Sequence, residues 1–347
     1  MRRVAICLIC WLGSITAQTG PFRVQTKIVQ VPVSVTDQNG RNLDGLAASD
    51  FAVFDDGIQR RVTLDNFDTG LPPISLAIAI QTSGLSTPAL AKIRRIGSMI
   101  QPLVIGAQGT AAVVVFDREI KWLQDFTLDD TEIQDALENL KAGPGMDQAR
   151  MLDAIAEVAD HMKQRKGRKV LLLISESRDR GSETTFQQAM EAVQRQGIEV
   201  FGAHYSAYAT TSTAKPKDLP DLSSSPTTSI DPSDEPECFC TVRISPMFVE
   251  LARLGKTNAI QALTLATGGS DYPWEREQGV DNAIEKLGME VHSQYILSFS
   301  QHESATGMHK IEVSLPSRSD LRVRSRRIYW EDQSGRADHI SAADSDR

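Results

Sequence analysis

Apolar residues recur along this chain with two different periods. Between residues 70 and 291, short apolar runs alternate with stretches that keep one apolar face at a spacing of 3.6 residues. We expect strands at 74–80, 110–117, 119–125, 169–175, 198–205 and 270–273, and helices at 87–104, 129–140, 148–165, 183–196, 247–266 and 276–291. Strands that are apolar throughout favour a sheet buried on both faces. The pattern predicts an α/β fold, with a doubly wound, mostly parallel sheet and helices on both faces.

The flanking segments alternate with a period of two, which is typical of strands with one buried face. Asp56-Gly57 divides two such runs and indicates a hairpin, while Pro32 indicates an edge strand or a bulge. Neither end alone has enough strands for a core. We therefore expect 25–68 and 292–330 to pair in one β-sandwich, with the domain of 72–291 inserted between them. Two small sheets on the flank of that domain are the alternative.

Residues 1–17 have the pattern of a secretory signal peptide. Basic MRR precedes the apolar run VAICLICWLGSI, and Ala17 stands before the expected cut. The apolar run is shorter than the ~20 residues of a bilayer span. We expect a cleaved signal and a secreted or periplasmic (cell-envelope) protein, and no transmembrane segment after cleavage. A retained anchor, or lipid attachment at Cys10, is the alternative.

Composition narrows the function. The chain has 347 residues, 41% hydrophobic and 24% charged, and a formal net charge of -8, which disfavours nucleic acid as a partner. Of its four cysteines, only Cys238 and Cys240 follow the signal, so no disulfide framework or metal-ligand pattern is present. Residues 206–246 are rich in Ser, Thr and Pro and predict a long loop, and 331–347 predict a flexible tail.

Three polar loops are candidates for a binding site. QTSGLS (81–86) follows the first α/β strand, GPGMDQARMLDAI (143–155) leads into a helix, and SESRDRGS (175–182) follows the strand at 169–175. Open parallel sheets bind ligands outside the carboxyl ends of their strands. We therefore expect these loops to meet at one edge.

At these loops the chain resembles a von Willebrand factor type A (VWFA) domain. The flanking segments, residues 31–62, LATGGSDYPW, SQYILSFS and LRVRSRRIYW, resemble those of the bacterial VWFA-related acidobacterial family. The resemblance implies a protein that binds other proteins or surface polymers. It also implies a divalent-cation adhesion site, built from Asp-x-Ser-x-Ser, a Thr before a helix, and an Asp after a later strand. Mg²⁺ prefers such oxygen ligands.

The carried-over cation site is degenerate in this chain. Its first Asp falls on Gln81, its first Ser is kept as Ser83, its second Ser falls on Leu85 beside Ser86, and its Thr falls on Ala149. An acid is kept after the later strand as Glu176. A unit charge pair at ~4 Å is worth about 4 kcal/mol at an effective dielectric of ~20, so losing the first carboxylate weakens any site substantially. The candidate binding edge is Gln81, Ser83, Ser86, Asp147, Ala149, Glu176 and Asp179.

We therefore expect no metal ligands of the usual kind and no cofactor. A weak Mg²⁺ or Ca²⁺ site rearranged around Asp147, Glu176 and Asp179 is the alternative. The chain has no G-x-S-x-G, P-loop, H-E-x-x-H or G-x-G-x-x-G motif, so we expect no enzyme. The expected function is metal-independent, non-catalytic binding of a protein or cell-surface polymer. A structural scaffold or assembly subunit of an envelope complex is the alternative, and a hydrolase built on Ser83 is a further one.

Overall fold

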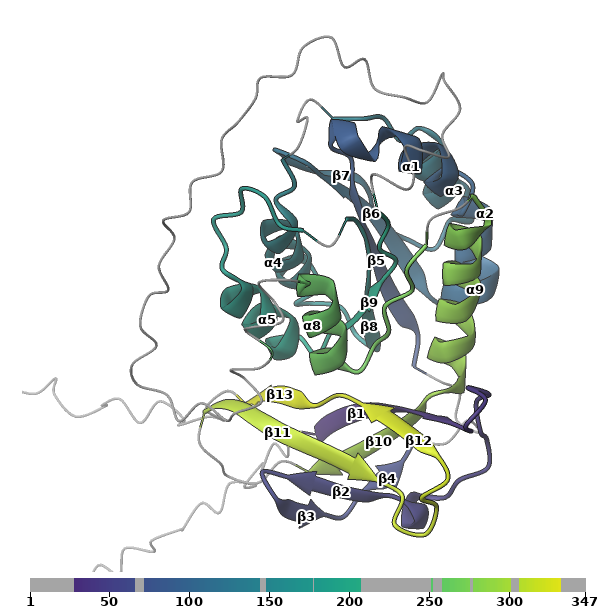
Figure 1. The fold of residues 1–347 in the computed structure, drawn as a ribbon, viewed down its shortest axis with the longest axis vertical. Helices are drawn as coiled ribbons and strands as arrows, with labels where there is room; N and C mark the ends of the chain where they lie inside the picture. Colours follow the sequence, from purple (N-terminus) through teal and green to yellow (C-terminus); the bar gives the residue numbers. More distant parts are fainter. Residues whose placement is uncertain are drawn as a thin grey trace, which may run out of the picture.

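Two folded parts, one α/β and one β, lie one above the other in Figure 1. The structure is a computed structural model, and it describes residues 28–65, 72–143, 148–176, 178–206, 251, 258–274, 277–300 and 306–331. The predicted signal peptide, the 206–246 loop beyond Ser206, Cys238, Cys240 and the tail beyond Glu331 lie outside the described residues.

The α/β part is built on a five-stranded sheet of order β7-β6-β5-β8-β9. The strands are β5 (Ile74–Gln81), β6 (Thr110–Phe116), β7 (Ile120–Thr127), β8 (Arg168–Ile174) and β9 (Glu199–Gly202). All pairs are parallel except that of the edge strand β7 with β6. β5 is buried along its whole length, as its apolar sequence predicts. The predicted fold class is confirmed.

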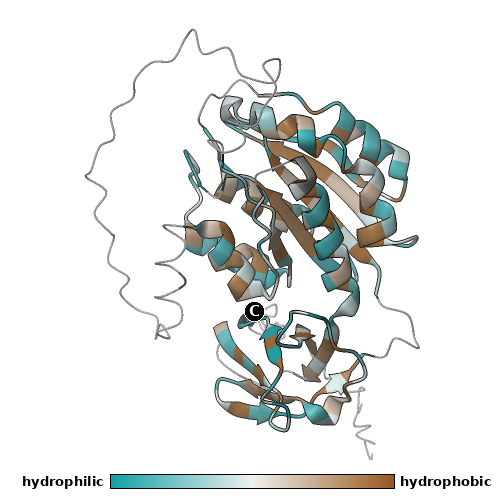
Figure 2. Cartoon of the chain, turned by 45° about the vertical axis from the view of Figure 1, so that its right-hand side comes forward, coloured by the Kyte–Doolittle hydropathy of each residue, from teal (hydrophilic) through white to brown (hydrophobic). Residues whose placement is uncertain are grey.

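Helices cover both faces of this sheet (Figure 1). They are α1 (Thr87–Ile93), α2 (Gly97–Ile100), α3 (Asp130–Glu138), α4 (Met151–His161), α5 (Phe186–Arg195), α8 (Ala259–Thr267) and α9 (Glu277–Ser293), with short helical turns η3 (Gly84–Ser86) and η4 (Gln101–Ile105). Leu76, Ile78 and Ile80 of β5 pack with α1, α2, α3 and α9 on one face. Ala77 and Ala79 pack with α4, α5 and α8 on the other. Figure 2 shows the strands between these layers as largely hydrophobic.

The β part combines strands from both ends of the chain. Its strands are β1 (Ile28–Thr36), β2 (Ala52–Asp55), β3 (Ile58–Arg60), β4 (Thr63–Leu64), β10 (Tyr295–Ser300), β11 (Gly307–Ser314), β12 (Arg322–Ser325) and β13 (Ile328–Glu331), with a 3-10 turn η1 at Ala48–Asp50. One sheet has the order β12-β1-β10-β4 and the other β13-β11-β2-β3. Both sheets mix the two ends and share one apolar core, so the sandwich is confirmed and the alternative of separate flank sheets is wrong. The predicted domain boundaries stay a prediction.

The hairpin and the proline follow local chemistry. Asp56 and Gly57 join β2 to β3 with φ angles of 47° and 83°, the left-handed conformations that a tight hairpin turn needs. β1 lies inside its sheet, so it is not an edge strand over its whole length. β12 pairs with β1 only from Val33 to Thr36, and Pro32 therefore has a paired strand, β10, on one side only. This placement fits its missing N–H.

Several predicted elements are shorter than expected. The helix predicted at 87–104 consists of three pieces, α1, α2 and η4. Arg94 directly follows α1, and its guanidinium donates two hydrogen bonds to the Leu140 carbonyl, at 2.6 Å and 3.0 Å. The strand predicted at 270–273 forms only isolated bridges, and that predicted at 198–205 ends at Gly202. In the basic segment 322–327, β12 ends at Ser325, and Arg326 after it is buried.

A buried polar network joins the two parts. α9 ends at Ser293 and β10 begins at Tyr295, so one residue, Gln294, connects them. The Arg168 guanidinium donates to the Val291 carbonyl at 2.6 Å, to Glu199 Oε2 at 3.1 Å and to the Gln294 side chain. The Gln294 amide in turn donates to Glu199. These contacts hold the end of α9 and the start of β10 against the amino ends of β8 and β9.

Candidate functional site

The candidate edge lies where the strand order of the α/β sheet reverses. β5 has β6 on one side and β8 on the other, so the loops after β5 and β8 leave the same edge side by side. This is the position where open α/β sheets bind ligands. The structure therefore brings Gln81, Ser83 and Glu176 together, as the sequence predicts.

Gln81 uses both ends of its amide inside the fold. Its Oε1 accepts a hydrogen bond from the Glu176 backbone N–H at 3.0 Å, and its Nε2 donates to Ser83 Oγ at 2.9 Å. The Gln81 side chain is only 1% exposed. An aspartate could not supply the donor that faces Ser83. The amide thus joins the loop after β5 to the loop after β8.

Ser83 and Ser86 continue this network inward. Their hydroxyl oxygens lie 3.1 Å apart, and both residues are fully buried. The Tyr205 hydroxyl lies beside Ser86, and burial raises the pKa of this phenol above its ordinary value. Ser83 therefore has Gln81 and Ser86 as its hydrogen-bond partners, an arrangement that holds a loop and does not activate a nucleophile.

Ala149 and Asp179 serve the backbone. Ala149 is buried and exchanges two backbone hydrogen bonds with Arg180, at 3.0 Å and 2.9 Å. Asp179 Oδ1 accepts from the Leu152 N–H at 3.0 Å and from Ser182 Oγ at 2.6 Å. Asp179 thereby satisfies an amide in the first turn of α4, which has no partner within the helix. The loop after β8 is thus fastened to the start of α4.

Asp153 fastens the same loop from the other side. Its carboxylate accepts from Arg150 Nε at 2.7 Å and from the backbone N–H groups of Glu183 and Thr184 at 3.1 Å and 2.8 Å. Burial alone would raise the pKa of Asp153, but the hydrogen bonds from Thr184 and Arg150 outweigh it and lower the pKa below its usual value. The charged form is therefore favoured in the folded chain.

Glu176 is the acidic residue of the candidate set that directly follows β8, and its environment shifts its pKa. It is partly buried, and burial raises its pKa, with Arg180 and the contact to Gln81 acting in the opposite direction. Asp147 lies outside the described residues. Gln81, Ser83, Ser86 and Ala149 are buried, so these four do not themselves form a contact surface, contrary to our expectation for them. Their burial follows from the network that the sequence pattern did not reveal.

The donors described at this edge do not fit the cation that the resemblance implies. Gln81 Oε1 and Asp179 Oδ1 already accept hydrogen bonds, and Ala149 offers no side-chain ligand. The Ser83 and Ser86 hydroxyls are fully buried and lie within hydrogen-bond distance of each other, whereas Mg²⁺ needs converging oxygen ligands in octahedral geometry.

Sequence reasoning missed two pairs near this edge. His204 follows β9, and its Nδ1 lies 2.7 Å from Asp271 on the segment that bridges to β9. Gly143 approaches Asp117 so closely that an added Cβ would lie 1.8 Å from Asp117 Oδ2, and the Gly143 N–H donates to the Thr82 carbonyl at 2.7 Å. No motif in the sequence marks either pair.

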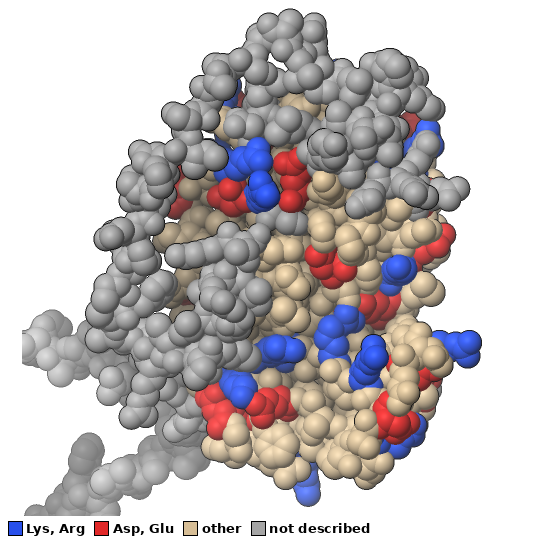
Figure 3. Space-filling model, in the orientation of Figure 1, with Lys and Arg blue, Asp and Glu red and all other residues tan. Residues whose placement is uncertain are grey.

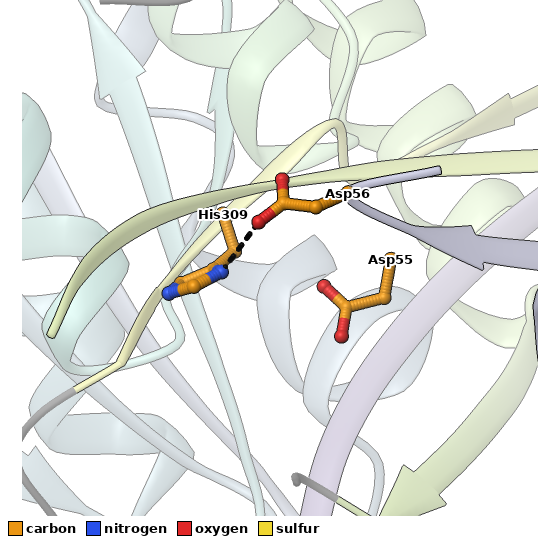
Figure 4. Close-up of side chains that lie close together, drawn as sticks. All are labelled: Asp55, Asp56 and His309. Atoms are coloured by element: carbon orange, nitrogen blue, oxygen red, sulfur yellow. Dashed lines mark hydrogen bonds and ion pairs between the residues drawn. The ribbon is translucent and has the colours of Figure 1, made fainter. Parts of the chain in front are cut away.

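One group of three potential metal ligands occurs among the described residues, in the β part. Figure 4 shows Asp55, Asp56 and His309, with His309 Nδ1 2.8 Å from Asp56 Oδ2. The Asp55 carboxylate forms an ion pair with Arg60 at 2.8 Å and accepts a hydrogen bond from the Tyr329 hydroxyl at 3.1 Å. Arg60 neutralises the Asp55 carboxylate, so we interpret the group as a structural cluster. Asp55 itself is buried, with an exposed fraction of 2%.

Comparisons with known proteins give structural neighbours only. No family model matches the chain, and no curated protein matches it. The chain is similar to the conserved hypothetical protein BatB from Bacteroides thetaiotaomicron, with a TM-score of 0.42, 14% identity and coverage of 63% of this chain and 97% of that one. An aerotolerance-related membrane protein from Bacteroides fragilis is similar with a TM-score of 0.41 and 13% identity, over 62% of this chain and 99% of that one.

A von Willebrand factor type A protein from Catenulispora acidiphila is also similar, with a TM-score of 0.40 and 12% identity over 83% of this chain and 53% of that one. The neighbours thus include the class of domain that the sequence resembles. The fold assignment itself rests on the strand order and pairing of this chain. Among the described helices, none combines the length and the apolar character that crossing a membrane requires.

Proposed function

We propose that this chain is an exported, non-catalytic binding protein that contacts a protein or surface polymer through the carboxyl edge of its α/β sheet. The observation that carries the proposal is the closed hydrogen-bond network of Gln81. It holds the loops of this edge in a fixed shape, and its described hydroxyls bond to one another and to the Gln81 amide. A rigid edge suits recognition, because a preorganised surface loses little entropy on binding.

The contact surface would be the loop after β8. Arg178 and Glu183 are exposed, whereas Asp153 and Asp179 hold the backbone of this loop in place. Exposed charges on a fixed loop give specificity through electrostatic complementarity. Binding should not depend on divalent cations, since the described side-chain oxygens of Gln81 and Asp179 are already engaged.

The experiment is a pull-down with the full-length chain from the envelope fraction of its source organism, followed by measurement of the affinity for each captured protein. Arg178→Glu combined with Glu183→Lys reverses both exposed charges and should weaken binding at least about tenfold. Lys286→Glu, an exposed charge reversal on α9, is the control and should leave the affinity unchanged. EDTA should have no effect.

Four results would contradict the proposal. Loss of binding in EDTA would refute metal independence, and equal affinities for the loop variant and wild type would refute the contact surface. Self-association at a fixed stoichiometry, seen by light scattering without any captured partner, would favour a scaffold. Turnover of ester, peptide or glycoside substrates that disappears in Ser83→Ala would favour a hydrolase.

A further inference from the structure

A groove separates the two folded parts at the opposite end of the α/β sheet from the candidate edge. It has a volume of about 690 Å³ and is lined by β1, β10 and β4 of one β sheet, by β3 and β13 of the other, by the start of β8 and by the end of α5. This volume is within the usual range for small-ligand sites, about 300–1,000 Å³.

The lining of the groove is basic although the chain as a whole is acidic. Six basic residues line it, against two acidic ones, Asp65 and Glu199. Figure 3 shows several Lys and Arg side chains along the junction of the two parts. Glu199 is already paired with Arg168 at 3.1 Å, and Asp65 accepts hydrogen bonds from Gln30 and Ser298. Two further cations, Arg60 and Arg195, are ion-paired with Asp55 and Glu191, so three of the six lining cations have no ion pair among the described residues.

Two of these three cations have no polar partner among the described residues. Neither Lys169 nor Arg61 forms a side-chain hydrogen bond or ion pair in the part of the chain that the structure describes. Lys169 is half-buried, and burial is the one cause that shifts its pKa, in the downward direction. A carboxylate beside this ammonium would raise its pKa. The groove thus holds a partly desolvated positive charge that a bound anion would stabilise.

Two buried polar atoms in the lining also lack partners. Arg326 is 5% exposed, and its guanidinium donates to the Gly197 carbonyl at 2.8 Å, but its Nε has no hydrogen-bond partner. Gln194 is 2% exposed, and its Oε1 has none. Buried polar groups are satisfied in most proteins, and an unsatisfied one costs about 1–3 kcal/mol. Both residues line the groove and keep unused hydrogen-bonding capacity beneath its surface.

We propose that this interdomain groove binds a ligand that carries a carboxylate or phosphate group. Guanidinium groups favour these planar or tetrahedral oxyanions because several N–H donors can point at them together. The inference goes beyond the proposed function, since the groove and the loop after β8 lie at opposite ends of the sheet. A ligand in the groove would bridge the two folded parts.

The test uses the full-length chain and three probes: inorganic phosphate, succinate and a glutamate tetrapeptide. Each is titrated by calorimetry in a low-salt buffer without competing anions. We expect saturable binding of at least one probe, and about tenfold weaker binding by Arg61→Gln with Lys169→Gln, which corresponds to 1.4 kcal/mol. The matched control, Arg41→Gln with Lys166→Gln, removes the same charge at exposed positions outside the groove and should bind like wild type.

A second measurement uses the wild-type chain alone. Trp330 lines the groove, whereas Trp122 lies on β7 at the far edge of the α/β sheet. The indole NMR signal of Trp330 should shift on titration while that of Trp122 stays in place. The probe that binds identifies the source of the anion. Absence of saturable binding for all three probes, or equal weakening in the control variant, would overturn the proposal. Failure of the pull-down above would leave this test unaffected.

Discussion

The hydrogen bonds of Gln81 make a sharp prediction about stability. Gln81→Met keeps the length and approximate volume of the side chain but removes its donor and its acceptor. The variant loses the 3.0 Å bond from the Glu176 N–H and the 2.9 Å bond to Ser83 Oγ. Each bond contributes about 1 kcal/mol net, and a shielded N–H left without a partner costs a further ~1–3 kcal/mol. Ser83 keeps Ser86 as a partner, so we expect a total loss of about 2–4 kcal/mol.

Urea denaturation followed by circular dichroism measures this loss as a change in the free energy of unfolding. Gln164→Met is the matched control, because Gln164 is exposed, and surface substitutions usually stay within about ±0.5 kcal/mol. Hydrogen exchange adds a local reading, since the Glu176 amide should lose protection in the Gln81 variant. If Gln81→Met costs no more than the control and the Glu176 amide keeps its protection, the amide does not hold this edge together.

Further predictions concern the junction and the edge. Arg168→Met leaves Glu199 buried without its counter-charge and should lower the free energy of unfolding by about 3–5 kcal/mol. Adding Glu199→Gln should recover part of this loss, which a double-mutant cycle measured by denaturation would show. Gly268→Ala should lower the melting temperature, because Gly268 has a φ of 94° and an added Cβ would lie 2.7 Å from the Arg326 backbone nitrogen. Burial raises the pKa of Glu176, so its contribution to stability is present below its ordinary pKa of 4.5 and is lost as pH rises through the raised value. Glu176→Gln should lack this loss. If the free energy of unfolding of variant and wild type changes in parallel between acid and neutral pH, the pKa shift is contradicted.

Local pattern was sufficient for most of the fold. The apolar run of β5, the amphipathic stretch of α4 and the Asp56-Gly57 turn each specify one structure through nearest-neighbour chemistry, and all three are found. The pairing of N- and C-terminal strands also followed from the sequence, because neither end could bury its apolar face alone. The helix predicted at 87–104 is divided into α1, α2 and η4, and the Arg94 side chain that follows α1 bonds to the Leu140 carbonyl, a contact far away in sequence that periodicity does not reveal.

The candidate edge shows the limit of pattern reasoning. The sequence placed Gln81, Ser83 and Glu176 at one edge, because the topology of a parallel sheet brings strand ends together. Their burial and the role of Asp179 depend on loops that meet in three dimensions, so no spacing along the chain could reveal them.

Periodicity along the chain was enough to establish the class of fold, since a residue's side of a helix or strand depends on its position in the sequence. The interdomain groove had no such signal. Arg61, Lys169 and Arg326 come from three distant segments, and each has an ordinary sequence environment. Their shared charge becomes significant only when folding brings them to one groove, where Lys169 is half-buried and Arg326 is buried, because desolvation and Coulomb interaction depend on the arrangement in space.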